Sequence, residues 1–235
     1  MGNITETVKH LIILNVILFV VPQFLNLDLT NILALHFPQN EHFGFWQYLT
    51  STFMHGSFGH ILFNMYGLYA FGTPLEQIWG KKKFLFFYFS TGIGASIIYT
   101  LVNYYQFNDA FEKLIELGAT KMEIMKLMDP TLIYNDEILQ TVNSLYNTSA
   151  LGASGAVYGV LVAFGLYFKE AKLAMIFFPI PIAAKYFIPI LLLGDLFFGM
   201  TRYSLGNIAH FAHVGGALVG FIIAWYWKKN QFKFS

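Results

Sequence analysis

Long apolar stretches dominate the chain, and single polar side chains interrupt several of them. A helix that crosses a bilayer needs about 20 mostly apolar residues. The pattern predicts six such segments, at 8–27, 58–78, 84–104, 152–168, 183–200 and 205–227. A cleaved signal peptide is the alternative for the first segment, but no small-residue cleavage site follows it. We therefore expect an all-α, polytopic membrane protein with a bundle of six transmembrane helices.

The composition agrees with a membrane protein and excludes several other classes. Only 11% of the 235 residues are charged and 56% are hydrophobic, whereas soluble domains carry about 25% charged residues. The net charge is +1 and lysines occur only in short groups, so we expect no nucleic-acid partner. Cysteine is absent, which excludes disulfides, cysteine nucleophiles and thiolate metal sites.

Two connections between the predicted spans are unusually long. Residues 26–56 are too polar to cross a membrane and rich in aromatic side chains, so we expect a structured loop anchored in the membrane interface by Phe45, Trp46 and Tyr48. Residues 105–150 have helical patterning and contain three lysines and seven acidic residues, a net charge of −4. We expect these residues to form an extramembrane helical insertion within a single membrane domain that covers residues 1–235.

The distribution of lysines predicts the orientation of the spans. With six spans, ten of the 14 basic residues lie on the side that carries both termini. Because positively charged loops favour the cytoplasm, both termini are predicted to be cytoplasmic. The segment 177–187 lies on the same side and contains two prolines, and it is predicted to re-enter the membrane surface before the fifth span.

The predicted fourth span carries a lone hydroxyl among small residues. Its start, "ALGASGAVYGV", places Ser154 near Gly155 and Gly159, which let another helix approach closely. Ser154 and Tyr158 are four residues apart, and they line a face adjacent to that of the two glycines. A lone serine at a helix contact is usually there for packing, so a reactive role requires a base nearby.

The predicted sixth span supplies a histidine on a matching small-residue face. His213, Gly216 and Gly220 share one side of this helix, and ionisable side chains inside a membrane are rare and usually functional. Two glycine-rich helices that pack together can bring Ser154 and His213 within hydrogen-bonding reach. That arrangement activates a serine hydroxyl as a nucleophile.

The predicted second span adds a third polar element. His60 and Asn64 are four residues apart on one face, and His55 precedes them. Both side chains can donate hydrogen bonds, so they suit an oxyanion hole. A zinc site that combines these histidines with His210 and His213 is the alternative. The HExxH pattern is missing and no carboxylate accompanies the histidines, so we expect no metal and no cofactor.

Taken in order, these motifs resemble the rhomboid family of intramembrane serine proteases. The nucleophile motif GxSG stands at 152–155, the histidine motif AHxxGxxxG at 212–220, the HxxxN element at 60–64, and GxxxExxxG at 72–80. The resemblance extends over nearly the whole chain, in the number of spans, the long first loop and the order of the serine and histidine helices.

The resemblance implies a mechanism and a setting. Ser154 would attack the scissile carbonyl, and His213 would act as base and then as acid in a Ser–His dyad. Tyr158 would stack on His213, while His60, Asn64 and the Ser154 backbone N–H would stabilise the oxyanion. The implied substrates are single-span membrane proteins in the lipid bilayer, and the implied location is the bacterial inner (plasma) membrane. The oligomeric state stays open.

Some residues fall outside this pattern. Asp195, in the predicted fifth span, is the one acid placed to join the dyad, but a buried carboxylate is costly in lipid, and we expect it to face a polar cavity instead. Glu76, which is part of the matched GxxxExxxG element, would be structural by the same resemblance. Trp46-Gln47 stands where many rhomboids have Trp-Arg, so anchoring of the first loop is expected to differ. The insertion at 105–150 either shapes access to the site, binds a partner or is a passive surface excursion.

Two other functions compete with proteolysis. A catalytically inactive rhomboid-like protein would bind membrane clients, but such relatives typically lack the nucleophile or the base, and both Ser154 and His213 are present here. A small transporter or channel would use histidine and asparagine in a pore and would survive the change Ser154→Ala. The sequence favours the protease.

Overall fold

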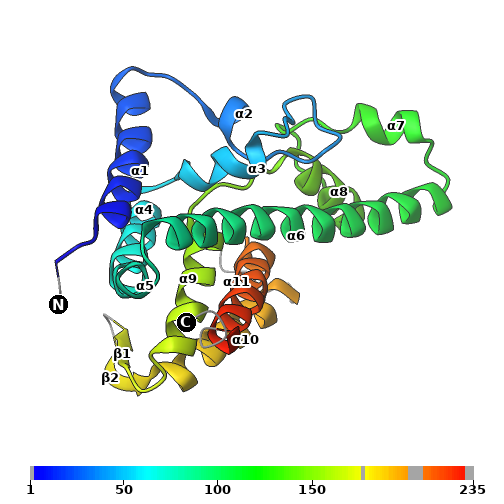
Figure 1. Cartoon of the computed structure of the whole chain (residues 1–235). Helices are drawn as coiled ribbons and strands as arrows, with labels where there is room; N and C mark the ends of the chain where they lie inside the picture. Colours follow the sequence, from blue (N-terminus) through cyan, green and yellow to red (C-terminus); the bar gives the residue numbers. More distant parts are fainter. Residues whose placement is uncertain (1–2, 176–177, 201–208, 231–235) are drawn as a thin grey trace.

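The computed structural model describes residues 3–175, 178–200 and 209–230 and is mostly helical (Figure 1). Its helices and strands follow one another along the chain as α1 Glu6–Phe24, α2 Thr30–Leu33, α3 Gln47–Thr50, η1 Ser51–Phe53, α4 Phe58–Gly67, η2 Leu68–Gly72, α5 Thr73–Trp79, α6 Lys81–Glu116, α7 Lys121–Lys126, α8 Glu137–Asn147, α9 Ser154–Tyr167, β1 Lys172–Met175, β2 Phe178–Ala183, α10 Ala184–Met200 and α11 His210–Asn230.

Helices stand at all six predicted positions, although the start of the sixth predicted span, 205–208, lies outside the described residues. Among the described helices, α1 and α6 are long and apolar enough to cross a membrane by themselves, and α9 is apolar but shorter. The helical class is therefore observed, whereas the count of six spans remains a prediction.

The second predicted span is one continuous helical segment in three parts. A single π-helical turn, η2, joins α4 to α5. Such turns usually mark a local insertion in a helix and are often found near functional sites. Glu76 in α5 accepts hydrogen bonds from the backbone N–H groups of Thr7 and Val8, at 3.1 and 3.0 Å, and from the Thr5 hydroxyl. It thus satisfies the free N–H groups at the start of α1, a structural role like the one expected.

Helix α6 is longer than the predicted third span. At 36 residues its length is about 54 Å, well beyond the hydrocarbon core of about 30 Å. We expected the span to end at residue 104, but the helix continues: Phe107, Ala110 and Leu114 extend its apolar face and form a small second core with Ile124 of α7 and Val142 of α8. Figure 1 shows α7 and α8 beside the end of α6 that lies far from α1.

The connection before α10 contains a strand pair that we did not predict. Strands β1 and β2 are antiparallel, with Lys172 opposite Ala183 and Leu173 opposite Ile182. The chain is therefore not purely α, and re-entry of 177–187 at the membrane surface stays a prediction. Prolines are tolerated in strands whose N–H side is unpaired, and each strand of a two-stranded sheet has one free edge.

The centre of the molecule is built around α9. This helix packs most extensively against α11 and α6, with α10 and the segment α4–η2–α5 completing its surroundings (Figure 1). Nine of its 14 residues are buried, and they belong to one large apolar core that also includes Phe84, Phe87 and Tyr88 of α6. The first residue of this central helix is Ser154, so its position is fixed by the whole bundle.

Candidate active site

The serine and the histidine selected from the sequence lie side by side. Ser154 Oγ is 2.9 Å from Nε2 of His213, although 58 residues separate them in the chain. Ser154 begins α9 and His213 lies in the first turn of α11. A hydroxyl and an imidazole at this distance form the hydrogen bond through which histidine can remove the serine proton.

Close contact between α9 and α11 is what brings these two side chains together. A Cβ on Gly220 would lie 2.6 Å from Gly159 Cα, and a Cβ on Gly216 would overlap the carbonyl oxygen of Gly155. A Cβ on Gly155 would lie 2.5 Å from Ala95 Cβ of α6. All four glycines selected for helix packing therefore lie where a methyl group would push neighbouring backbones apart.

Tyr158 holds the plane of the His213 ring. The two rings are stacked with centroids 4.2 Å apart and an interplanar angle of 11°. Because Tyr158 lies one turn after Ser154 in α9, the same helix presents the hydroxyl to one edge of the imidazole and a flat aromatic surface to its face. This is the stacking partner that the sequence predicted.

The chain that leads into Ser154 is held from outside its own helix. Leu35 in the first loop exchanges both backbone hydrogen bonds with Ala150, each 2.8 Å long, and the Gly152 N–H donates to the carbonyl of Ser51 at 2.9 Å. Gly152 has φ +126°, and a Cβ there would lie 2.6 Å from His60 Nε2. Glycine is therefore required at this position both by backbone conformation and by space.

Nitrogen donors from α4 surround the same stretch. His60 Nε2 lies against Gly152, and Asn64 Nδ2 is 3.7 Å from the place that a Gly152 Cβ would occupy. Asn64 Nδ2 is buried without a hydrogen-bond partner in the described structure, so it is available to an incoming oxygen. His55 packs its ring on that of His60, with centroids 5.0 Å apart, and so supports it from the loop before α4.

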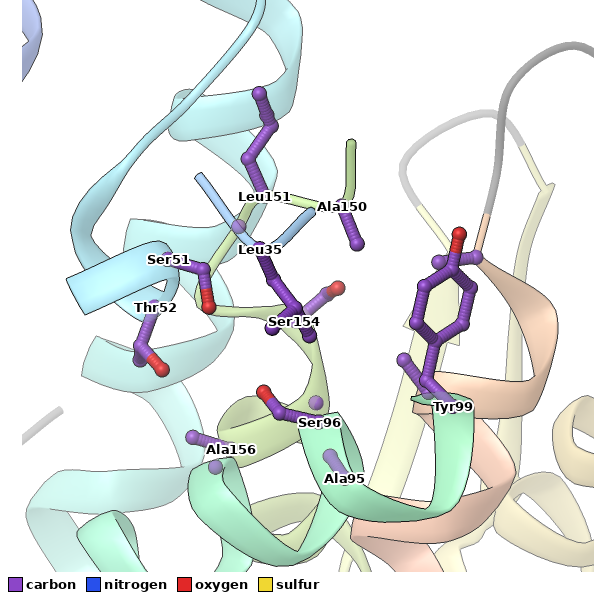
Figure 2. A pocket seen from close by; sticks show the side chains of 15 residues that line it. Leu35, Ser51, Thr52, Ala95, Ser96, Tyr99, Ala150, Leu151, Ser154 and Ala156 are labelled. Atoms are coloured by element: carbon purple, nitrogen blue, oxygen red, sulfur yellow. The ribbon is translucent and has the colours of Figure 1, made fainter. Parts of the chain in front are cut away.

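A small cavity of about 30 Å³ opens beside Ser154. Figure 2 shows Ser154 between Leu35 and Ser51 of the first loop and Ser96 and Tyr99 of α6. The volume is enough for one or two water molecules, and several hydroxyl groups point toward it. A polar space at this point of an otherwise apolar bundle could deliver water to the serine.

The first loop is anchored by Gln47. We expected the anchoring of this loop to differ, because many rhomboids have arginine where this chain has Gln47. The buried amide accepts from the His36 N–H at 3.1 Å and donates to the carbonyl of His42 at 2.7 Å. Trp46 donates its indole N–H to the carbonyl of Ile32 at 2.6 Å and leaves its ring 57% exposed. The loop that holds Gly152 is thus itself fixed by an uncharged amide.

Asp195 is not where we expected it. Instead of facing a polar cavity, it is buried, and its Oδ1 accepts hydrogen bonds from His213 Nδ1 at 3.1 Å and from His210 Nδ1 at 2.7 Å. We expected no carboxylate beside the histidines, and this expectation is wrong, because Asp195 contacts both His210 and His213 in the folded chain. The sequence identified Asp195 as the one acid able to join the dyad but favoured a polar cavity, because Asp195 is in a different predicted span from both histidines.

The donors of Asp195, His210 and His213 all lie within 4.8 Å of one another, which is close enough for a metal ion. The same atoms are already paired by hydrogen bonds. The zinc site considered from the sequence also included His60, but in the described structure His60 Nε2 lies against Gly152, whereas His210 Nδ1 is bonded to Asp195.

Comparison with known proteins gives one consistent answer. The family model described as "Rhomboid domain" matches residues 42–230. The chain is 31% identical over 191 residues to the RHOMBOID-like protein 12, mitochondrial, of Arabidopsis thaliana, covering 79% of this chain and 47% of that protein. It is 27% identical over 181 residues to the Rhomboid protein 1, mitochondrial, of Saccharomyces cerevisiae, covering 76% and 41%.

A bacterial protein is also similar. The chain is 25% identical over 185 residues to the Rhomboid protease AarA of Providencia stuartii, covering 76% of this chain and 54% of that protein. The chain thus spans about half the length of the curated relatives it matches.

The comparisons contradict the location that we predicted. The similar proteins from yeast, Arabidopsis thaliana and Bos taurus are all named as mitochondrial, so the assignment to a bacterial plasma membrane is wrong. The assignment of both termini to the cytoplasm falls with it. Lysine placement predicts which loops share a side of the membrane, but it does not identify the organelle.

Proposed function

Because this chain belongs to the rhomboid family, we propose that it is an intramembrane serine protease that cleaves single-span membrane proteins through Ser154 and His213. The observation that carries the proposal is the 2.9 Å contact between Ser154 Oγ and His213 Nε2. One similar protein, from Providencia stuartii, is named a protease, and others are named only as rhomboid proteins.

The first chemical step is attack by Ser154 on the scissile carbonyl carbon. Its hydroxyl proton passes to His213 Nε2 as the bond from Oγ to carbon forms, and the carbonyl oxygen becomes an oxyanion. The imidazolium then gives the proton to the leaving nitrogen as the C–N bond breaks. Water attacks the acyl-enzyme in the same way, with His213 again accepting and returning a proton.

The oxyanion has donors on two sides. As the first residue of α9, Ser154 has a backbone N–H without an intrahelical partner, and the positive end of the helix dipole faces the same point. His60 and Asn64 approach from α4 across Gly152. Donors fixed in place before the reaction stabilise a developing charge most strongly where water is scarce.

The depth of the site supports a protease that works near one membrane surface. We propose that α1, α4–η2–α5, α6, α9, α10 and α11 form six spans and that Lys81–Lys83 mark the lysine-rich surface. Ala95 touches Gly155 and lies 14 residues after Lys81, about 21 Å along α6. In a core of about 30 Å the site then lies about 9 Å below the opposite surface.

The same placement puts the rest of α6, with α7 and α8, outside the membrane. About 24 Å of α6 would project beyond the hydrocarbon core on the side of the active site. The apolar core shared by α6, α7 and α8 would give this insertion a fixed shape. A substrate helix would have to unwind near this surface, because its peptide bonds are shielded and hydrogen-bonded while helical.

The proposal is tested by cleavage in detergent or vesicles. The purified chain, Ser154→Ala and His213→Ala are incubated with a fluorescent single-span substrate whose transmembrane segment contains helix-breaking residues. We expect cleavage by the unchanged chain and at least a 10³-fold loss in both variants. A fluorophosphonate probe gives a second measure, since it should label Ser154 only when His213 is present. Equal rates for all three proteins would refute the protease and favour a client-binding relative.

A further inference from the structure

The proposed mechanism assigns no role to Asp195 or His210, although both are buried close to His213. Asp195 in α10 is 9% exposed and His210 at the start of α11 is 7% exposed. Both belong to one hydrogen-bonded chain that runs from His210 through Asp195 to His213 and on to Ser154. Burying a carboxylate inside a bundle is costly unless it is fully bonded, so the arrangement calls for an explanation beyond packing.

The chemistry of the donors fixes the protons along this chain. A carboxylate can only accept hydrogen bonds, so both imidazoles must donate to Asp195 through Nδ1. In neutral His213 the second nitrogen, Nε2, then carries the lone pair. That lone pair points at Ser154 Oγ, which is the tautomer a general base requires.

We propose that Asp195 is a positioning residue, which fixes the tautomer and orientation of His213, and that His210 holds the carboxylate in place for this role. The inference rests on the proposed function and deepens it, because it replaces a two-residue site with a four-residue relay of contacts. Asp195 does not touch the substrate and takes no proton. It acts only through His213.

Tyr158 and Asp195 restrain different motions of the same ring. Stacking on Tyr158, at an interplanar angle of 11°, fixes the plane of the imidazole but leaves rotation within that plane. The bond from Nδ1 to Asp195 at 3.1 Å removes that rotation and also prevents a ring flip. The stacking and the hydrogen bond together therefore fix both the plane of the His213 ring and its rotation within that plane.

His210 provides a second hydrogen bond, which fixes the orientation of the Asp195 carboxylate. Its Nδ1 is closer to Asp195 Oδ1 than that of His213, at 2.7 Å against 3.1 Å, and its ring stacks at 6.0 Å on Phe198 of the same α10 helix as Asp195. When His213 gains the proton of Ser154, both of its nitrogens carry hydrogen. Its Nδ1–H stays on Asp195, and the positive charge then lies beside a carboxylate that is already oriented.

The test separates turnover from substrate binding. The kcat and KM of the single-span substrate are measured for the unchanged chain, Asp195→Asn, His213→Ala and the control Asp109→Asn. Asp109 is exposed and paired with Lys113, so the control makes the same chemical change outside the bundle. We expect kcat of Asp195→Asn to fall by about 100-fold or more with KM within about twofold, because the amide offers a donor that favours the wrong tautomer. The control should match the unchanged chain.

The outcomes distinguish this inference from the proposed function. If Asp195→Asn stays within about threefold of the unchanged chain while His213→Ala is inactive, the positioning role is refuted and the protease stands. If the unchanged chain is no more active than His213→Ala, the proposed function itself fails. If the unchanged chain loses activity on chelation and regains it with zinc, the three side chains are a metal site and the positioning role is overturned.

A measurement on the unchanged chain guards against a variant that does not fold. The ¹⁵N spectrum of histidine-labelled protein, with the His213 signals assigned by their loss in His213→Ala, reports which ring nitrogen carries hydrogen. We expect Nδ1–H with Nε2 unprotonated. The reverse tautomer would overturn the inference whatever the behaviour of Asp195→Asn.

Discussion

Replacing Gly216 by alanine tests whether the closeness of α9 and α11 sets the reactivity of Ser154. The new Cβ would overlap the carbonyl oxygen of Gly155, and at the next turn the matching position on Gly220 is only 2.6 Å from Gly159 Cα. Since ordinary contacts of this kind lie at about 3.4–4 Å, the helices would have to separate by at least about 1 Å. On these two helices, Ser154 directly precedes Gly155, and His213 lies about one turn before Gly216.

The effect on activity should exceed the effect on stability. Overpacking costs about 1–3 kcal/mol, and alanine regains about 1 kcal/mol over glycine within a helix, so the free energy of unfolding should fall by no more than about 2 kcal/mol. A separation of 1 Å would stretch the 2.9 Å bond between Ser154 and His213 beyond hydrogen-bonding distance. Misplacement on this scale costs about 10²-fold in rate.

The assay compares cleavage rate and thermal unfolding in the same preparation. Gly194→Ala is the matched control, because a Cβ on this residue within α10 meets nothing within 4 Å. We expect Gly216→Ala to lose about 10²-fold in kcat and Gly194→Ala to keep its rate. A Gly216→Ala protein that cleaves within about twofold of the unchanged chain would show that helix spacing does not set the reactivity of Ser154.

Three further predictions follow from the site. Gly152→Ala should lower kcat by at least about tenfold, because the residue has φ +126° and a Cβ would strike His60; an unaltered kcat would contradict this. Gln47→Leu should lower the melting temperature by several degrees, since it leaves the buried His36 N–H unpaired, and the exposed change Leu49→Ala is its control. Burial and the neighbouring His60 lower the pKa of His55 to about 4. Stability should therefore be full above pH 6.5 and decline toward pH 4, less so in His55→Gln, and equal pH profiles would argue against it.

Much of the site could be predicted because its motifs can be recognised within single helices. Gly155 and Gly159 share a face of α9 beside that of Ser154, and His213 and its glycines share a face of α11. Helical periodicity alone identifies such stripes, and glycine stripes on two helices predict that the helices touch. The helix positions followed from the same periodicity, with ends shifted by a few residues.

What the sequence did not show depends on contacts between distant segments. The extension of α6 to Glu116 is stabilised by Phe107 and Leu114 packing on α7 and α8, and no local signal marks that partnership. The strand pair at Lys172–Ala183 is short, and its second strand contains two prolines, which usually argue against a strand. The bacterial plasma membrane was an implication of the family resemblance, and charge placement could not have corrected it, because it distinguishes two sides of a membrane but not one membrane from another.

Asp195 shows why a lone acid in a predicted span is hard to interpret. From sequence, its cost in lipid argued for a polar cavity. Asp195 and the two histidines lie in different helices, so helical periodicity could not relate them. The cost is met instead by two imidazoles that converge on one oxygen from a separate helix. The same hydrogen bonds therefore stabilise the buried carboxylate and orient the His213 ring. Glycine contacts can set only the distance between α9 and α11, whereas the direction in which His213 presents its lone pair requires a third helix, and α10 supplies it through Asp195.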